Sequence, residues 1–409
     1  MKKKVSVVSM FNKVLNSIKE GTFFEKVIHK IKVVFRRRMR NRIINSVEID
    51  PKKVMFFTFQ GKYTCNPKAI AEEFIKRDSD FKLVWVVRKE ELEQKDRFPK
   101  ELKLVVRNSK EFYRELASSK YVIQNANDTI YCGYNKRKGQ VFFQTWHGSL
   151  GFKRLDTNNN ENWVKKAHIL ASETDYLTSN STFENDVFRT SYWKDSEILE
   201  IGHPRNDVLL DDEQRVEMDK YVRKYYNISP KTKIALYAPT FRDDFDFKTY
   251  DLDYKRILDN LKKRFGGKWV LMVRFHFKLR NVEFPMELSN EIINATDYYD
   301  MQDLLCAADV GITDYSSWIC DYVLTGKPGF LYANDIENYI NERGFYYSLN
   351  ETPFPISATN DELEKNILEF DEKKYEKDRK EFLKQRGCFE TGNASKLVVD
   401  KIIQLDKEA

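Results

Sequence analysis

The sequence alternates short apolar stretches with amphipathic ones, and this alternation constrains the fold more than any other feature. Helical patterns, such as 67–77 and 252–265, fill the gaps between the apolar stretches. Strands that alternate with helices form parallel sheets covered by helices. The sequence contains two such series of alternating strands and helices. It therefore predicts an α/β protein with two Rossmann-like domains facing a cleft. The expected strands are 54–59, 83–87, 121–124, 141–146, 176–179 and 198–202, then 233–238, 269–275, 310–313 and 329–333.

The length of 409 residues suits this plan, because it exceeds that of one ordinary compact domain. We expect an N-terminal Rossmann-like domain at 46–210, a C-terminal one at 211–390 and a final helix at 391–409. The five cysteines lie far apart without a CxxC pair, so zinc-finger and thioredoxin-type sites are excluded.

A basic arm precedes the first domain. Residues 1–45 hold thirteen basic and two acidic residues, a charge of +11, which leaves −4 for the other 364 residues of a chain whose total is +7. Apolar residues recur in the arm at three- and four-residue spacing, which predicts a basic amphipathic helix. Such a helix can lie in the headgroup plane of an anionic membrane. Packing of its apolar stripe on the body is the main alternative, and nucleic-acid binding is disfavoured because the body shows no basic stripe.

No apolar run reaches the ~18 residues that a membrane-spanning helix needs. The first residues also lack a signal-peptide cleavage site. We therefore expect a protein held peripherally at the cytoplasmic face of the cell membrane through residues 1–45.

Three of the five histidines directly follow an expected strand. His147 lies where strand 141–146 ends, and Gly148 permits the tight turn that exposes its imidazole. A histidine there can abstract a proton near neutral pH. Arg274 and His276 occupy alternate positions at another strand end, where a cationic pair can bind phosphate. His203 follows a third strand, and the nearby Arg205 could reach an anionic ligand; for any single strand-end histidine, a structural role is the alternative.

The stretch 310–324 gives a more specific phosphate signal. An expected strand ends at Thr313, and Ser316 or Ser317 then supplies an N-cap for a helix through Leu324. Free backbone N–H groups at such a helix start form an anion site. Asp321 lies one turn into this helix and could accept hydrogen bonds from ligand hydroxyls.

Other enzyme classes lack their motifs in this sequence. There is no Walker A loop, no nucleophile elbow and no HExxH, so P-loop NTPase, α/β-hydrolase and zincin activities have no support. Pro239 and Thr240 lie at a strand end, but their chemistry is ambiguous from the residues alone.

Read together, these stretches resemble the CDP-glycerol glycerophosphotransferase family of teichoic acid polymerases and primases. The TWHG motif at 145–148 and the TDYSS motif at 313–317 occur in the family's order. The resemblance implies a GT-B fold with the donor site in the C-terminal domain. It covers the stretches 61–74, 144–156, 177–192, 201–209, 236–244, 273–277, 303–339 and 343–347.

The resemblance also implies the site residues. His147 and His276 match the family's two essential histidines, so we expect them to be catalytic. Two departures are visible: Phe277 replaces the usual proline, and Ser149-Leu150-Gly151 replaces Thr-Pro-Leu. The implied contacts with the CDP-alditol donor are Gly148, Ser149, Leu150, Gly151, Arg205, Pro239, Thr240, Arg274, Phe275, His276, Ser316, Ser317 and Asp321.

The implied reaction moves an alditol phosphate, glycerol or ribitol phosphate, from a CDP-alditol to a lipid-linked teichoic-acid-type acceptor, with CMP leaving. His147 would be the general base, and His276, Arg274 and the backbone at 316–317 would stabilise the phosphate charge. We expect no cofactor and no metal, because the cationic groups can replace one. The alternatives are a GT-B glycosyltransferase that uses a nucleotide sugar and a non-catalytic membrane-binding protein.

Overall fold

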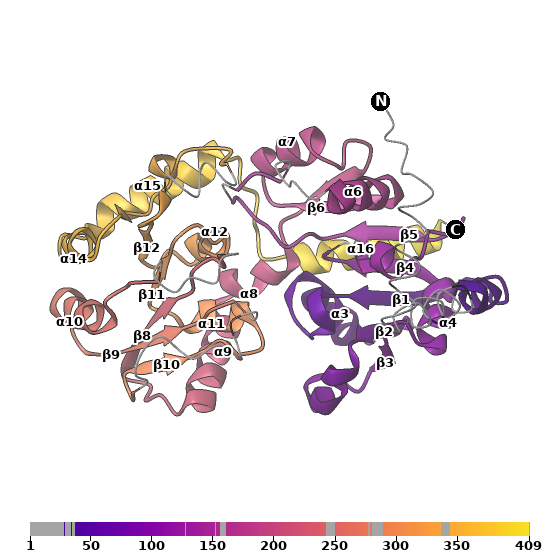
Figure 1. The fold of residues 1–409 in the computed structure, drawn as a ribbon, viewed down its shortest axis with the longest axis horizontal. Coiled ribbons are helices and arrows are strands. Elements are labelled where there is room, and N and C mark those ends of the chain that lie inside the picture. The colour runs from indigo at the N-terminus through magenta and orange to yellow at the C-terminus, as the bar shows by residue number, and fades with distance from the viewer. Residues whose placement is uncertain are drawn as a thin grey trace, which may run out of the picture.

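The computed structural model describes residues 28, 34, 37–126, 128–151, 153–155, 161–242, 250–276, 279, 289–336 and 344–408. They form two lobes, each built on one sheet (Figure 1). We call the half with β1–β7 the N-lobe and the half with β8–β13 the C-lobe. Every strand pair in both sheets is parallel within the described residues. The predicted α/β class with two Rossmann-like halves is confirmed.

The N-lobe sheet has seven strands in the order β3-β2-β1-β4-β5-β6-β7. The order reverses between β1 and β4, and ligands of such sheets bind in the crevice at the carboxyl ends beside that point. The strands are β1 (Asp50–Phe57), β2 (Lys82–Val87), β3 (Leu102–Val106), β4 (Ser119–Gln124), β5 (Val141–Gln144), β6 (Tyr176–Ser179) and β7 (Glu197–Glu200). The helical elements are η1 (Phe59–Gly61), α3 (Cys65–Lys76), η2 (Lys89–Arg97), α4 (Lys110–Ser118), α5 (Asp128–Tyr131), α6 (Glu161–Glu173) and α7 (Thr182–Thr190).

Strand β1 shows why this sheet carries helices on both faces. Its side chains alternate between the faces, as a strand requires. Val54 and Phe56 pack in the cluster that contains Phe74 of α3, whereas Met55 and Phe57 pack in the cluster that contains Phe112 of α4. A strand buried on both sides reads as a continuous apolar run, which is why it was visible in the sequence.

The C-lobe sheet has six strands in the order β10-β9-β8-β11-β12-β13. Its strands are β8 (Thr232–Tyr237), β9 (Lys268–Val273), β10 (Ile292–Asn294), β11 (Val310–Thr313), β12 (Gly329–Tyr332) and β13 (Ile356–Ser357). Its helical elements are α9 (Asp212–Tyr226), α10 (Tyr254–Phe265), α11 (Met301–Ala307), α12 (Trp318–Tyr322), η6 (Val323–Thr325), η7 (Leu349–Glu351), α14 (Asn360–Leu368) and α15 (Glu372–Gln385). The short elements η3 (Pro204–Asn206) and α8 (Asp207–Leu210) lead from one lobe to the other.

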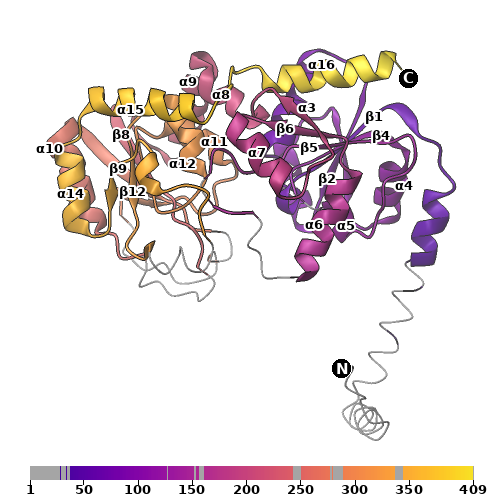
Figure 2. The same cartoon turned by 90° about the horizontal axis from the view of Figure 1, so that it is seen from above.

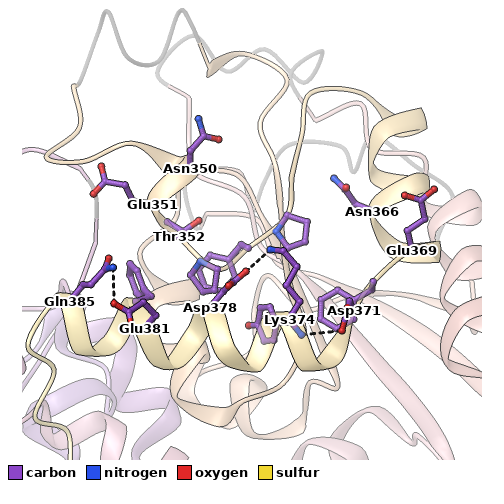
Figure 3. Close-up of a pocket in the computed structure, with 16 residues that line it drawn as sticks. Asn350, Glu351, Thr352, Asn366, Glu369, Asp371, Lys374, Asp378, Glu381 and Gln385 are labelled. Carbon is purple, nitrogen blue, oxygen red and sulfur yellow. Dashed lines mark hydrogen bonds and ion pairs between the residues drawn. The ribbon is translucent and has the colours of Figure 1, made fainter.

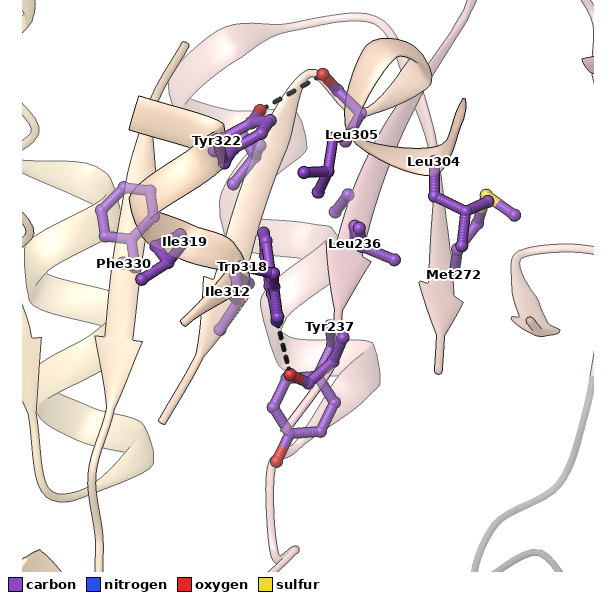
Figure 4. Close-up of a cluster of buried hydrophobic side chains, with 14 of the residues drawn as sticks. Leu236, Tyr237, Met272, Leu304, Leu305, Ile312, Trp318, Ile319, Tyr322 and Phe330 are labelled. Atoms are coloured by element: carbon purple, nitrogen blue, oxygen red, sulfur yellow. Dashed lines mark hydrogen bonds between the residues drawn. The ribbon is translucent and has the colours of Figure 1, made fainter. Parts of the chain in front are cut away.

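The C-lobe core packs α12 onto the ends of β8 and β11 (Figure 4). Trp318 lies among Leu236, Ile312 and other apolar side chains, and its indole N–H donates to the Ala238 carbonyl at 2.8 Å. The Tyr322 hydroxyl donates to the Ala308 carbonyl at 3.2 Å. These two bonds satisfy polar atoms inside the core and fix the helix that carries Asp321.

The last helix, α16 (Ala394–Lys407), leaves the C-lobe and returns to the N-lobe (Figure 2). Its Val398, Val399 and Ile402 are fully buried in the cluster formed by Val54 and Phe74. The chain therefore passes between the lobes twice, once at η3 and α8 and once between α15 and α16.

Most of the basic arm, 1–45, lies outside the described residues. Of its end, residues 37–44 are helical. Ile43 and Ile44 pack against the Met55 and Phe112 cluster of the N-lobe. Among the described helices, none is long and apolar enough to cross a membrane.

Candidate active site

His147 sits in a turn just beyond the end of β5. The preceding Trp146 adopts a left-handed backbone conformation with φ 50°, and its carbonyl accepts a hydrogen bond from the Asn66 amide at 3.1 Å. A Cβ on residue 148 would lie 2.9 Å from the Trp146 indole nitrogen, so Gly148 is required for this turn. The Trp146 and His147 rings lie 4.4 Å apart between centroids. The turn thus holds the imidazole at the carboxyl edge of the sheet.

The hydrogen bonding of His147 defines its tautomer. Its Nδ1 lies 2.6 Å from the Asn125 carbonyl oxygen, at the end of the neighbouring strand β4. A carbonyl only accepts, so Nδ1 carries the proton and Nε2 carries the lone pair. Loss of hydration lowers the pKa of His147 below its ordinary value near 6.5; the Asn125 bond opposes this shift, and the charge of Arg205 adds to it. The imidazole is therefore neutral at pH 7 and can accept a proton at Nε2.

Arg205 and Asp321 join the two lobes. Arg205, on η3, donates from Nε and Nη2 to the Asp321 carboxylate of α12 at 2.9 and 3.1 Å, and both side chains are buried. Arg205 Nη2 also donates to the Gly148 carbonyl, next to His147. Within the described part of the chain, Arg205 Nη1 has no hydrogen-bond partner. A buried guanidinium N–H left open in this way can receive an anionic ligand.

The hydrogen-bond partners of Asp321 differ from those expected. Besides Arg205, it accepts hydrogen bonds from the Asn206 amide at 3.0 Å and the Gln302 amide at 3.2 Å. Its carboxylate therefore faces protein donors, and its predicted contact with a ligand stays a prediction.

Two further predicted residues lie at the carboxyl end of β8, and a lysine from the N-lobe reaches them. Pro239 and Thr240 follow the strand, and the Thr240 backbone N–H donates to Asp314 Oδ1 at 2.8 Å. Lys153 Nζ donates to Thr240 Oγ1 at 3.2 Å. Lys153 also forms an antiparallel bridge with Phe345, so residues of the C-lobe contact this lysine through its backbone and its side chain.

The 316–317 turn meets the loop that follows His147. A Cβ on Gly151 would lie 3.2 Å from Ser317 Cβ. Ser317 is the N-cap residue of α12, but its backbone is already helical and its hydroxyl makes no capping hydrogen bond. The helix expected through Leu324 is α12 followed by the 3-10 turn η6.

Arg274 and His276 have different neighbours. Arg274 Nη1 lies 3.2 Å from Met301 Sδ, and burial lowers the pKa of its guanidinium. The His276 ring lies 5.0 Å from the Phe241 ring. Between them, Phe275 is buried, and its N–H donates to Thr296 Oγ1 at 3.1 Å. Their joint action on a phosphate stays a prediction.

His203 has a structural setting. It is fully buried, and its Nε2 lies 2.9 Å from a Glu184 carboxylate oxygen. The structural alternative for a strand-end histidine therefore applies to His203.

A cavity of about 190 Å³ brings part of the predicted set together. His147, Gly148, Ser149, Gly151 and Ser317 line it, together with Lys153 and residues of α7. A second cavity, of about 480 Å³, has Arg205 in its wall with Lys68 and Asp300. Pro239, Arg274 and His276 line neither of these two cavities.

A hollow of about 700 Å³ lies elsewhere in the C-lobe, between the 350–355 segment and α15 (Figure 3). Its rim residues Lys374 and Asp378 pair with each other, as do Glu381 and Gln385. It contains none of the predicted site residues, so it is no candidate for the reaction. No group of three or more His, Cys, Asp or Glu in the described residues could hold a metal ion.

A family model described as CDP-Glycerol:Poly(glycerophosphate) glycerophosphotransferase matches residues 39–404. The chain belongs to this family. It is 30% identical to a teichoic acid poly(glycerol phosphate) polymerase of Staphylococcus epidermidis over 98% of its own length and 58% of that protein's. It is 29% identical to a polymerase of the same description from Bacillus spizizenii, covering 88% of this chain and 94% of that one. The solved structure of the wall teichoic acid polymerase TagF matches with a TM-score of 0.79 at 30% identity, over 94% of this chain and 98% of that one.

These matches confirm the predicted glycerophosphotransferase family and the GT-B-like fold. Four residues that contact the site or its immediate neighbours were not assigned from the sequence: Asn125, Lys153, Asn180 and Glu390. Lys153 and Asn180 fall within stretches that resemble the family, so they could have been found there. Asn125 shows no motif, and Glu390 lies more than 200 positions along the chain from Asn180, which it contacts.

Proposed function

We propose that this chain transfers an alditol phosphate, glycerol phosphate first among the candidates, from a CDP-alditol to a hydroxyl of a lipid-linked teichoic-acid-type acceptor. The observation that carries the proposal is the tautomer of His147, which leaves Nε2 as the proton acceptor, on a residue that lines a cavity together with residues of both lobes. Family membership supports the donor class, and the names of the two polymerases above support glycerol.

The proposed step is a single displacement at phosphorus. The acceptor hydroxyl oxygen attacks the phosphorus that bears the alditol, and the bond from that phosphorus to the CMP oxygen breaks. The hydroxyl proton passes to His147 Nε2, and CMP leaves with the bonding electron pair. General base catalysis of this kind contributes about 10²- to 10⁴-fold.

Cationic groups beside the cavities support binding of the donor phosphates. Arg205 contacts the loop of His147 through Nη2, and its buried Nη1 has no hydrogen-bond partner among the described residues. Lys153 lies against Thr240, a residue that resemblance assigns to the donor. Charge on a transferring phosphoryl group is stabilised by such fixed donors. His276 is the second proposed catalytic residue, acting on the same charge.

Release of nucleotide tests the reaction. The chain is incubated with CDP-glycerol, CDP-ribitol and UDP-sugars in the presence of a synthetic lipid-linked acceptor, and CMP and UDP are measured. We expect CMP release and growth of the acceptor by one alditol phosphate mass or more. UDP release from a UDP-sugar would instead identify the glycosyltransferase alternative.

His147→Asn tests the proposed base. We expect its rate to fall by about 10²-fold or more. His168→Asn is the matched control, because His168 is exposed on α6 and packs only beside Tyr192 in the described contacts. Equal rates for wild type and His147→Asn would contradict the assignment.

We further propose that the basic arm holds the enzyme at the cytoplasmic face of the membrane. Its charge of +11 supports this, as does the exposure of two described apolar side chains, Ile28 at 49% and Val34 at 51%. Deleting residues 1–36 leaves Ile43 and Ile44 packed on the N-lobe, so the body should stay folded. We expect the deletion to abolish flotation with phosphatidylglycerol vesicles; unchanged flotation, or competition by DNA in the full chain, would count against the membrane role.

A further inference from the structure

The segment 387–390, which leads from α15 back to the N-lobe, is held against residues 180–182 by backbone hydrogen bonds. The Phe389 N–H donates to the Asn180 carbonyl at 3.0 Å, and the Thr182 N–H donates to the Gly387 carbonyl at 3.1 Å. Ser181 and Cys388 form an antiparallel bridge between these contacts. The next residue of this segment with a charged side chain is Glu390. Its position is therefore set by the stretch between β6 and α7.

The Glu390 carboxylate occupies a slot made of uncharged donors. It accepts hydrogen bonds from the Asn206 amide at 2.8 Å, the Asn180 amide at 3.1 Å and the His203 backbone N–H at 3.2 Å. A Cβ on Gly202 would lie 2.4 Å from its Oε2, and Gly202 has φ +93°. Only glycine leaves room for the carboxylate at this point, so the slot depends on that residue.

Two routes lead from this carboxylate to the loop that follows His147. On the first, the Asn180 amide donates to Ser149 Oγ at 2.9 Å, two residues beyond His147. The other passes through Asn206 to Asp321, and from there through Arg205 to the Gly148 carbonyl. Glu390 is the residue at which the two routes meet.

We propose that Glu390 is a positioning residue that holds the His147 loop in its reactive arrangement, an inference that rests on the proposed function. Glu390 touches neither the cavity nor His147, so it acts through Asn180 and Asn206. Misplacement of a reacting group by about 1 Å can cost about 10²-fold in rate, so the loss of one anchor should be visible in turnover.

Glu390→Gln tests the inference with almost no change in volume. It keeps one oxygen for the two asparagine amides and places an NH₂ against the His203 N–H. We expect kcat to fall about tenfold, with the KM for CDP-glycerol changed by less than about twofold, because orientation and not donor affinity is lost. Glu369→Gln is the matched control, since Glu369 is an exposed carboxylate at the end of α14.

Ser149→Ala is the second variant, because it deletes a single hydroxyl and cuts only the first route. Glu390→Gln and Ser149→Ala should be non-additive when combined, as expected for residues on one network. Additive losses in the double variant would show that Glu390 does not act through Ser149 and would overturn this route.

A readout without substrate separates this inference from the proposed function. Selective ¹⁵N labelling gives signals from only five histidines. In the wild type we expect the Nδ1–H tautomer of His147, and in Glu390→Gln a loss of that preference, with the control unchanged. His147 signals that are identical in wild type and Glu390→Gln would overturn the inference. If the signals move but the wild type releases no CMP from any CDP-alditol, the proposed function fails and the positioning role stands.

Discussion

Two buried arginines show the same pairing chemistry at different places in the molecule. Arg242, at the strand ends of the C-lobe, bonds Asp335 through Nε and Nη2 at 2.8 and 3.0 Å, Asp314 through Nη2 at 2.9 Å and the Thr240 carbonyl through Nη1 at 2.9 Å. Arg205, at the junction of the lobes, pairs with Asp321 alone and keeps Nη1 open among the described residues.

The two arginines differ in whether a guanidinium nitrogen lacks a hydrogen-bond partner among the described residues. Arg242 faces two carboxylates, and each of its nitrogens is engaged, so it serves the fold of one lobe. Arg205 faces one carboxylate and touches the loop of His147, so it can serve a ligand and the alignment of both lobes. A buried ion pair is weak evidence for stability. A buried donor without a partner among the described residues, such as Arg205 Nη1, is in contrast a candidate contact for a ligand.

Removal of the C-lobe arginine should have the largest effect on stability. Arg242→Met leaves Asp314 and Asp335 without their partner, and breaking a buried pair costs about 3–5 kcal/mol. Thermal denaturation followed by circular dichroism measures the loss. Because Arg242 is engaged within the lobe, we expect CDP-glycerol to raise the Tm of the variant as it does for the wild type. If CDP-glycerol did not raise the Tm of Arg242→Met, Arg242 would contribute to donor binding as well, and the assignment of a ligand role to Arg205 alone would be contradicted.

The junction also holds a carboxylate that lacks a direct cationic partner. Burial raises the pKa of Glu390 to about 7, although His203, Asn206 and Asn180 oppose the shift, whereas the hydrogen bonds from Arg242 outweigh burial and lower the pKa of Asp335. Between pH 4.5 and 7 the folded chain then binds more protons at Glu390 than the unfolded chain does. The free energy of unfolding therefore falls with rising pH in that window, by about 3 kcal/mol for this group.

Urea denaturation at several pH values checks this contribution. Glu390→Gln should flatten the decline between pH 4.5 and 7 and should be no less stable than the wild type at pH 7. A variant that loses turnover without losing stability would separate positioning from folding. An equally steep decline in the variant would show that another group titrates.

Replacement of the junction arginine should affect the ligand more than the fold. Arg205→Lys keeps a charge for Asp321 but removes the forked donors and the open Nη1, at a cost of about 1–3 kcal/mol in stability. We expect donor affinity, measured by calorimetry with CDP-glycerol, to fall about tenfold or more. Arg256→Lys is the control, since Arg256 pairs with Asp361 and Glu364 at the surface. Equal affinity in Arg205→Lys and the control would remove Arg205 from the donor site.

The pH profile sharpens the same comparison. His147 must be neutral to accept a proton, and its pKa is lowered from the ordinary value near 6.5, so the loss of kcat/KM caused by protonation of His147 should appear below pH 6.5. Arg205→Met removes a charge that lowers this pKa, so the acid limb should move to higher pH. Arg242→Met should leave the limb in place.

The smallest effect is expected at another contact between the lobes. The Tyr299 hydroxyl donates to Glu91 at 2.8 Å and accepts from the Tyr63 N–H at 3.1 Å. Tyr299→Phe should cost about 1 kcal/mol in stability and leave kcat unchanged. Tyr221→Phe on the exposed face of α9 is the control. A large loss of turnover in Tyr299→Phe would place catalytic alignment at this contact as well.

The sequence predicted the strands that lie inside each sheet and missed three at the edges. Central strands such as β1 and β8 are buried on both faces and read as apolar runs. The edge strands β3, β10 and β13 are short or carry exposed residues, so their patterns are weak. The lobe on which α16 packs was also not predictable from the sequence, because an apolar stripe on a helix does not indicate which surface it covers.

Residues that line the cavity of the candidate site were predicted where a strand end or motif marked them, as for His147 and Ser317. The pairing of Arg205 with Asp321 was not visible, since the two lie 116 positions apart and each was assigned to the ligand. Glu390 carries no local signal at all. Its role depends on a backbone crossing that only the fold provides.

The packing of α16 on the N-lobe also determines the order in which the two lobes can complete their cores during translation. The N-lobe core includes Val398, Val399 and Ile402, although its seven strands end at Glu200. A chain emerging from the ribosome must therefore complete nearly the whole C-lobe before the first lobe can close its core. Until then, the apolar surface around Val54 and Phe74 remains open to chaperones or to other nascent chains.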